Sequence, residues 1–224
     1  MFEAIHLIGT GRAGGAIRAR LRERGLRVTD GRKPDPSAEL VLLAVPDAVI
    51  AEVASSVEVG PWIAHVSGAT RLAALDPHER RFSTHPLQTL SAARGPDQLD
   101  GAWAAVSGES PEAVARARWL AETLGLEPFE VADADRSRYH AAAVIGGNYV
   151  VTLHQVATRL LAEVGAPPEA IVPLMRRTIE NGFELTGPIA RGDWSTVEAH
   201  LAALAERDPD LVPLYRALAE ATRA

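Results

Sequence analysis

The 224-residue sequence predicts an α/β fold, in which a doubly wound sheet is followed by an all-helical C-terminal region. Three observations support this prediction. Short apolar runs alternate with helical segments in the first part of the chain. A glycine-rich turn directly follows the first of these runs. After Asp133 the pattern becomes helical throughout, so we expect one domain over residues 1–132 and a second over residues 133–224.

The first apolar run, residues 4–8, leads through a glycine turn into a helix in which Ile17 and Leu21 lie four residues apart. Strand, glycine turn and helix in this order are the context that the G-x-G-x-x-G fingerprint of a Rossmann dinucleotide-binding domain requires. The first glycine permits a sharp turn, the second leaves room for a pyrophosphate, and the third lets the helix pack closely on the sheet. The free N–H groups and the dipole of that helix favour an anion at its start. A glycine turn without a ligand is the alternative; we favour cofactor contacts by Gly9, Thr10, Gly11, Arg12, Ala13 and Gly14.

The end of the second predicted strand, residues 26–29, should meet the 2′ position of the adenosine ribose. Asp30 lies 21 positions after Gly9, where an acid commonly accepts a hydrogen bond from the ribose 2′-hydroxyl. Arg32 and Lys33 can instead bind a 2′-phosphate, the arginine through its planar fork of donors. A solvated turn without a ligand is the third alternative. Because the arginine has the longer reach, we expect the cofactor to be NADP(H).

Five further strands and two helices complete the predicted first domain. Residues 39–45 form a continuous apolar run, as expected for a parallel strand buried on both faces. Ser67 follows another strand, in the zone where ligands of α/β sheets bind, although a simple turn residue is the more common interpretation there. At the end of the apolar run 39–45, we also expect Ala44, Val45 and Pro46 to contact the cofactor. The other strands are predicted at residues 62–66, 81–84, 102–106 and 128–131, and the helices at residues 48–56 and 111–124.

The C-terminal region is predicted to be helical, with short loops. Residues 135–165 fit one long helix, and its segment 141–147 is small and apolar on every side. A second helical stretch covers residues 167–182, in which Pro173 should cause a kink or a restart. One small domain cannot cover helices this apolar. We therefore expect a homodimer formed by the C-terminal helices.

The composition excludes several kinds of protein. The sequence has no cysteine, which rules out disulfides, thiol catalysis and cysteine-bound metals. The histidines at positions 6, 65, 78, 154 and 200 show no metal-ligand spacing, so no metal is expected. A net charge of −6 and scattered basic residues argue against nucleic acid as a partner. No apolar stretch reaches membrane-spanning length and no signal peptide precedes the glycine motif, so we expect a soluble, cytoplasmic protein that does not bind membranes. Lys33 is the only lysine, which excludes a catalytic lysine elsewhere.

Motifs along nearly the whole chain resemble one superfamily. The glycine fingerprint, the VLLAVPD strand end and the helical half are similar to pyrroline-carboxylate reductases, β-hydroxyacid dehydrogenases and ketopantoate reductases. The segments HVSGAT, STHPLQT, DRSRYHAAAVIGGNYVVTL and LTGPIARGD resemble a bacterial family of Rossmann-like proteins with a C-terminal domain of unknown function. The resemblance implies an NADP-dependent oxidoreductase and no particular substrate. β-Hydroxyacid dehydrogenases place a lysine four residues before an asparagine. Here Asn148 matches the asparagine but Val144 takes the lysine position, so that group's lysine-assisted chemistry is not carried over.

His140 and Asn148 are the main candidates for catalysis. They lie eight residues apart and share one helix face, which in the architecture that the resemblance implies looks toward the nicotinamide. A histidine there would protonate a carbonyl or imine as hydride is delivered, and Asn148 would orient the substrate. A buried structural histidine is the alternative. His85, fixed by Pro86, is expected to line the same cleft. Arg191 can bind a substrate carboxylate, or else cap the preceding helix or bridge to a partner subunit.

We therefore predict an NADP-dependent oxidoreductase that transfers a hydride to or from a small carbonyl, hydroxy or imino compound. The alternative from another class is a non-catalytic NADP(H)-binding sensor or assembly protein, which the lysine-free cleft leaves open. An S-adenosylmethionine methyltransferase also has a glycine turn after its first strand. That interpretation has no role for the VLLAVPD strand end or the long helical half.

Overall fold

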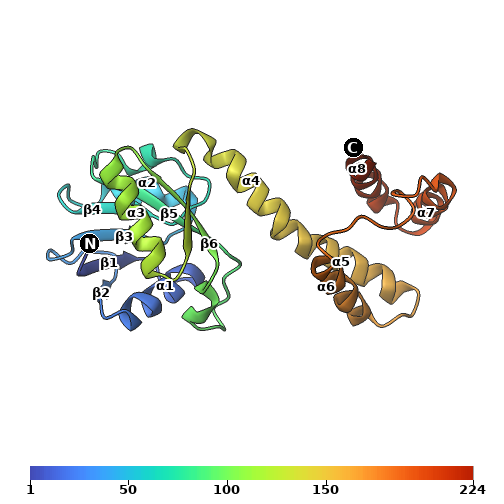
Figure 1. Ribbon diagram of the computed structural model, residues 1–224, viewed down its shortest axis with the longest axis horizontal. Coiled ribbons are helices and arrows are strands. Elements are labelled where there is room, and N and C mark those ends of the chain that lie inside the picture. The colour runs from blue at the N-terminus through green and yellow to red at the C-terminus, as the bar shows by residue number, and fades with distance from the viewer. Residues whose placement is uncertain (224) are drawn as a thin grey trace. The chain divides into compact units, whose positions relative to one another are not determined.

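The structure is a computed structural model that describes residues 1–223 and divides into two compact units (Figure 1). The first unit comprises Met1–Thr152, and the second begins at Leu153. The first unit extends beyond residue 132, where we expected the sheet domain to end, because it includes the helix that follows the last strand.

The first unit is built on a seven-stranded sheet with the order β2-β1-β3-β4-β5-β6-β7. Neighbouring strands run parallel, except that β5 and β6 are antiparallel. With the helices between the strands, this sheet confirms the predicted α/β class. The strands are β1 (Ala4–Ile8), β2 (Arg27–Asp30), β3 (Leu40–Leu43), β4 (Trp62–His65), β5 (Arg81–Leu87), β6 (Trp103–Gly108) and β7 (Glu127–Glu130).

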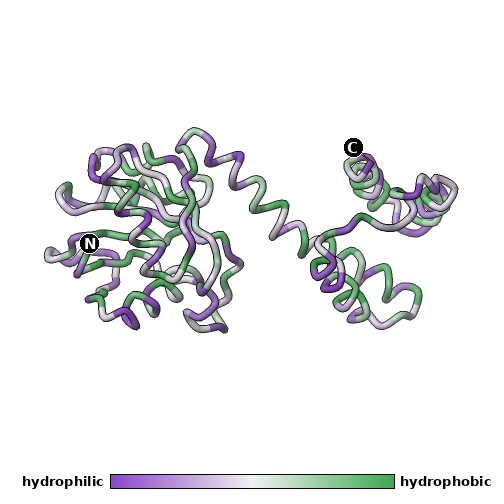
Figure 2. The backbone as a smooth tube through the Cα atoms, in the orientation of Figure 1, coloured by the Kyte–Doolittle hydropathy of each residue, from purple (hydrophilic) through white to green (hydrophobic). Residues whose placement is uncertain are grey.

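Apolar residues of the strands form two buried clusters, one on each face of the sheet. Figure 2 shows the hydrophobic colouring of the chain along these strands. In β3, Leu40 and Leu42 belong to one buried cluster and Val41 and Leu43 to the other, because successive side chains of a strand point to opposite faces. The first face is covered by α1 (Arg12–Glu23) and α3 (Pro111–Thr123), and the second by α2 (Ile50–Ser55) and the short helix η2 (Leu72–Leu75). The unbroken apolar run of β3 therefore contributes side chains to the hydrophobic cores on both faces of the sheet.

Local signals set the ends of the helices. The Ser110 hydroxyl accepts the N–H of Ala113 at 3.1 Å and caps α3. Gly25 and Gly125 follow α1 and α3 with φ angles of +79° and +84°, a left-handed conformation that glycine adopts without strain. These two glycines therefore define where both helices stop.

The strand order reverses at β1, which has β2 on one side and β3 on the other. The strands β1, β3, β4 and β5 are mutually parallel, so their carboxyl ends lie along one edge of the sheet. In open α/β sheets, ligands bind outside the carboxyl ends of the strands at such a reversal. This edge is therefore the expected place for a functional site.

The helices after the sheet differ from the prediction at two points. The predicted single helix is divided into α4 (Arg136–Gly146) and α5 (Asn148–Glu163). The helix is interrupted at Gly147 (φ −111°, ψ −68°), whose angles stay in the right-handed region but depart from those of a regular helix. Consecutive glycines favour such a break because they lower the helix propensity. Pro173 causes no kink inside a helix, since α6 (Ile171–Glu180) begins just before it. The proline lies in the first turn, where its missing N–H is not needed.

Polar contacts connect the helices of the second unit. Arg159 forms ion pairs with Asp208 at 2.8 Å and Asp210 at 3.3 Å. His200 Nδ1 and the Tyr215 hydroxyl share a hydrogen bond of 2.7 Å between α7 (Trp194–Arg207) and α8 (Val212–Arg223). No helix within residues 1–223 is long and apolar enough to cross a membrane.

Candidate functional site

The glycine turn after β1 depends on the absence of two side chains. Gly9 has a φ angle of +101°, and a Cβ atom there would lie 2.4 Å from the carbonyl oxygen of Ala44. A Cβ atom at Gly14 would lie 2.0 Å from the carbonyl oxygen of Gly9, so α1 approaches the turn only because residue 14 is glycine. By contrast, no atom lies within 4 Å of the position that a Cβ of Gly11 would take. The start of α1 therefore faces open space.

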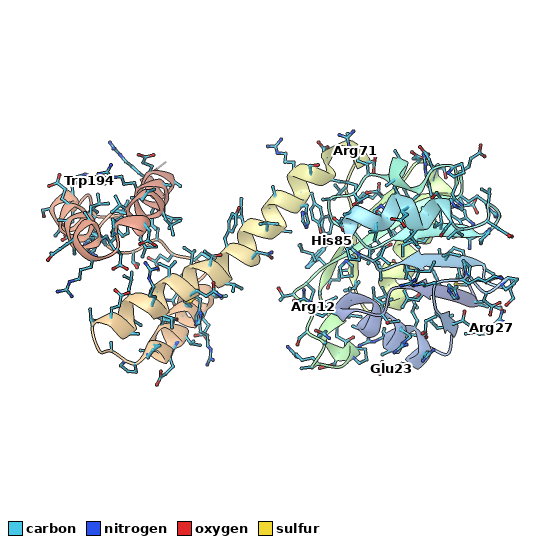
Figure 3. The ribbon with its side chains drawn as sticks, turned by 180° about the vertical axis from the view of Figure 1, so that it is seen from behind. Arg12, Glu23, Arg27, Arg71, His85 and Trp194 are labelled. Carbon is cyan, nitrogen blue, oxygen red and sulfur yellow. The ribbon has the colours of Figure 1, made fainter. Side chains whose placement is uncertain are left out.

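The N-terminus of α1 fits an anionic group such as the pyrophosphate of a dinucleotide. No side chain caps the helix at Gly11, and its first turn contains no acid that would compete for the N–H groups. A cavity of about 480 Å³ adjoins this end and is lined by Thr10, Gly11 and Arg12 on one side and by Arg94 on the other. Figure 3 labels Arg12 at the start of the helix. The two guanidinium groups add positive charge beside the cavity.

The residues predicted after β3 lie against the glycine turn. The Ala44 methyl group lies 3.2 Å from the position of a Cβ at Gly14, and Val45 Cγ1 lies 3.0 Å from that of Gly9. Pro46 precedes the short helix η1 (Asp47–Val49). The structure therefore brings Ala44, Val45 and Pro46 to the same edge of the sheet as the glycine turn.

The loop after β2 is held by His6, which the sequence analysis did not single out. His6 Nδ1 accepts the N–H of Asp35 at 3.3 Å and lies 2.8 Å from Thr29 Oγ1, while Nε2 donates to the carbonyl oxygen of Gly31 at 3.2 Å. This buried imidazole fixes the segment that carries the predicted basic pair.

Asp30 and the basic pair have different surroundings. The Asp30 carboxylate forms ion pairs with Arg18 at 3.1 Å and Arg22 at 3.2 Å. Arg32 and Lys33 are exposed and form no ion pair within residues 1–223. Two arginines of α1 therefore already neutralise the carboxylate that would repel a phosphate, while the basic pair is free to bind one.

A second cavity, of about 590 Å³, contains all three predicted catalytic residues, His85, His140 and Asn148. The two imidazole rings lie 5.9 Å apart between centroids, with one ring edge-on to the other. A Cβ atom at Gly68 would lie 2.5 Å from His140 Cδ2 and 2.9 Å from His85 Nε2, so the rings meet over a residue without a side chain. Figure 3 labels His85, which lies within β5 and not after the strand as predicted.

Tyr139 joins this cavity and was missed by the sequence analysis. Its hydroxyl shares a hydrogen bond of 2.7 Å with His85 Nδ1, and its ring packs against Phe129 with a centroid distance of 5.8 Å. Burial lowers the pKa of His85 to about 4 and raises the pKa of Tyr139 to about 12, so both groups are neutral at pH 7. Adjacent residues of a helix point in different directions, so Tyr139 lies off the helix face that carries His140 and Asn148.

Arg136, the first residue of α4, is a fully buried cation and was also missed. Its guanidinium donates to Ser107 Oγ at 2.9 Å, to Ser83 Oγ at 2.5 Å and to the carbonyl oxygen of Ser67. Burial lowers the pKa of Arg136. The side chain connects the start of α4 to the turn after β4, to Ser83 of β5 and to Ser107 of β6.

The Ser67 hydroxyl forms hydrogen bonds both within its own turn and with the segment after β3. Its hydroxyl donates to Asp47 Oδ2 at 2.7 Å and accepts the N–H groups of Ala69 and Thr70. These contacts agree with the interpretation of Ser67 as a turn residue. Arg191, the predicted carboxylate ligand, is exposed in a loop of the second unit.

Comparison with known proteins supports the fold and the predicted resemblance. Residues 102–222 match the model of a domain of unknown function, DUF2520. No curated protein matches the chain in sequence.

Solved structures match over nearly the whole chain. A protein from Bacteroides fragilis, provisionally named an NADP oxidoreductase, has 22% identity and a TM-score of 0.82 over 99% of this chain and 98% of its own. The reductive aminase from Aspergillus terreus, solved in complex with NADPH and ethyl levulinate, has 14% identity and a TM-score of 0.72, over 98% of this chain and 93% of its own. The 1-pyrroline-5-carboxylate reductase from Streptococcus pyogenes has 15% identity and a TM-score of 0.62, over 98% of this chain and 96% of its own. These similarities confirm a Rossmann-like fold followed by a helical region.

Proposed function

The chain belongs to the DUF2520 family, and we propose that it is an NADP-dependent oxidoreductase acting on a small carbonyl, hydroxy or imino compound. One observation carries the proposal. The edge of the sheet that presents an open, uncapped helix N-terminus also presents a cavity lined by His85, Tyr139 and His140. A dinucleotide needs the first of these features, and proton exchange with a substrate needs the second. The solved neighbours named above include NADP oxidoreductases, which supports this reaction class.

The cofactor would extend from the basic pair to the catalytic cavity. Gly9, Gly11 and Gly14 would receive its pyrophosphate at the start of α1, while Arg32 and Lys33 would bind the 2′-phosphate. The Asp30 carboxylate does not oppose a 2′-phosphate, because it is already paired with Arg18 and Arg22. This pairing supports a preference for NADP(H) over NAD(H). Thr10, Arg12, Ala13, Ala44, Val45, Pro46 and Ser67 complete the proposed cofactor contacts.

The preference for NADPH is tested by measuring dissociation constants from the fluorescence of bound NADPH and NADH. One charge-assisted contact to phosphate contributes roughly 1.5–3 kcal/mol, or about ten- to a hundredfold in affinity. We therefore expect Arg32→Ala to remove most of the preference for NADPH and to leave NADH binding unchanged. Arg24→Ala, at the other end of α1, is the matched control and should change neither constant. Equal affinities in the unmutated protein would show that Asp30 governs the site instead.

The reaction would take place in the cavity that contains His85, His140 and Asn148. Bound NADPH supplies a hydride to the electrophilic carbon, and the oxygen or nitrogen bonded to it needs a proton. The Asn148 amide can orient that polar group by hydrogen bonding. The titratable rings at the cavity can supply the proton.

Turnover is tested by following NADPH absorbance with a panel of aldehydes, ketones and cyclic imines. We expect at least one class to be reduced, and Asn148→Ala to lower kcat/KM by about tenfold with little change in NADPH affinity. NADPH binding without turnover of any class would favour the non-catalytic sensor or assembly protein. Absence of NADPH binding would reject both interpretations.

A further inference from the structure

The hydroxyl of Tyr139 and the imidazole of His85 form the closest polar pair on the catalytic cavity, at 2.7 Å between the hydroxyl oxygen and Nδ1. We propose that Tyr139 is the residue that gives the proton to the substrate and that His85 restores it. This inference rests on the oxidoreductase function proposed above. It replaces the expectation from the sequence that His140 is the acid.

The contacts of the three rings distinguish Tyr139 from His140. The side chain of His140 forms no hydrogen bond within residues 1–223, and its ring contacts are with His85 and over Gly68. Tyr139 is held from two sides, because its ring packs against Phe129 and its hydroxyl is bonded to His85. A general acid must be held in a defined position relative to the atom that it protonates. Tyr139 meets this requirement, and His140 serves to position His85.

The proton transfer can be written without a further reagent beyond NADPH and water. With His85 as the Nδ1–H tautomer, Nδ1 donates to the Tyr139 oxygen, which leaves the hydroxyl proton free for the substrate. As hydride reaches the carbonyl carbon, the carbonyl π bond breaks and its electron pair moves to the oxygen. That oxygen bonds to the Tyr139 proton, and the tyrosine oxygen accepts the Nδ1 proton. His85 Nε2 takes a proton from water, so one neutral tautomer replaces the other and hydroxide leaves to the solvent.

The surroundings keep this pair neutral across the working pH range. Burial is the first cause of the low pKa of His85, about 4, and of the high pKa of Tyr139, about 12. The titratable and charged groups that face the pair come from α4, from the segment after β3 and from β4, and they are Arg136, His140, Asp47 and His65. Because neither member of the pair changes protonation between about pH 5 and pH 9, a Tyr139 acid predicts a flat profile of kcat there.

The test removes the hydroxyl and keeps the ring. In Tyr139→Phe, we expect kcat for the best substrate of the panel to fall by about a hundredfold or more, with KM and the dissociation constant of NADPH changed less than about threefold. The matched control is Tyr215→Phe, which breaks a tyrosine–histidine hydrogen bond of the same length, 2.7 Å, in the second unit. This control should retain the wild-type kcat.

A second readout requires neither cofactor nor substrate. ¹⁵N spectra of histidine-labelled apoprotein should show the His85 ring nitrogens shifting in Tyr139→Phe and staying unchanged in Tyr215→Phe, where the His200 nitrogens shift instead. Unshifted His85 nitrogens in Tyr139→Phe would overturn the coupling of the two side chains.

Three kinetic outcomes reject the proposal. One is a kcat of Tyr139→Phe within about threefold of the wild type. Another is a wild-type kcat that falls tenfold per pH unit above about pH 7, because this is the behaviour expected when the acid is an imidazolium instead of a tyrosine hydroxyl. The pH profile needs no variant, so it decides the question even where Tyr139→Phe fails to fold. A wild type without turnover of any compound rejects the proposed function together with the acid, whereas the first two outcomes reject the acid alone.

Discussion

His65, at the end of β4, is a fully buried imidazole whose only polar contact is with its own turn. Its Nδ1 accepts the N–H of Ser67 at 3.2 Å, and its Nε2 has no hydrogen-bond partner within residues 1–223. Burial lowers its pKa to about 3, with the charge of Arg136 as the second cause. His65 is therefore neutral in the folded protein at every pH that an assay would use.

This burial predicts a loss of stability in mild acid. Above the unfolded pKa of about 6.5, neither state binds a proton at His65. Below it, only the unfolded state does so until about pH 3, and the unfolding free energy falls by roughly 1.4 kcal/mol per pH unit from this residue. Urea unfolding between pH 7 and pH 4 measures the slope. In His65→Gln the slope should be smaller by about one proton, and an unchanged slope would contradict the assignment.

At the scale of single elements, the start of α1 predicts opposite results for two glycines of one motif. Gly11 faces open space, so Gly11→Ala should leave the thermal stability unchanged and weaken NADPH binding by about tenfold or more, because the methyl group occupies the pyrophosphate position. Gly14→Ala should lower the unfolding free energy by roughly 1–3 kcal/mol or more, since its Cβ would overlap the carbonyl oxygen of Gly9. Thermal melts and NADPH titrations separate the two effects. Equal destabilisation by both variants would be inconsistent with this geometry.

The attachment of α4 depends on Arg136. In Arg136→Met the hydroxyls of Ser83 and Ser107 and the carbonyl oxygen of Ser67 lose their donor while buried. We expect a loss of roughly 3 kcal/mol or more in unfolding free energy, from urea titrations. Arg138→Met, two residues further along the same helix and exposed, is the control and should change stability by less than about 0.5 kcal/mol. A small effect at Arg136 would indicate that the helix is held by other contacts.

At the scale of the whole molecule, the second unit exposes many large apolar side chains. They come from α6, from the loop that follows it and from the start of α7, and they are Val172, Leu174, Ile179, Phe183, Leu185 and Trp194. Large apolar side chains exposed in this number favour burial against a partner. We propose that a second copy of the chain covers them, as the sequence led us to expect.

Light scattering should therefore give twice the chain mass of 23.9 kDa at micromolar concentration. Leu174→Glu combined with Ile179→Glu should yield a monomer, because two charges would be buried at the interface without partners. Val59→Glu alters an equally exposed apolar residue of the first unit and should leave the dimer intact. A monomer in the unmutated protein would refute the proposed dimer.

The sequence by itself determined the fold class and the glycine turn. Alternating apolar runs and helical segments, with a glycine or a capping residue at their ends, are local patterns, and local patterns set strands, helices and their stops. For this reason the strand positions, the cap at Ser110 and the motif that begins at Gly9 could be read without a structure. The prediction of one continuous helix over residues 135–165 was wrong at Gly147, because the apolar periodicity continues across a break that consecutive glycines permit.

Only the tertiary structure decided which polar side chains meet. His85 and Tyr139 are 54 positions apart in sequence, and nothing local to either predicts the bond between them. Nothing in the sequence distinguishes Arg136 from the exposed Arg138, but the packing of α4 against the sheet buries the Arg136 guanidinium among serine hydroxyls. The physical reason is that burial and hydrogen bonding between distant segments arise from packing, which the periodicity of one segment does not contain.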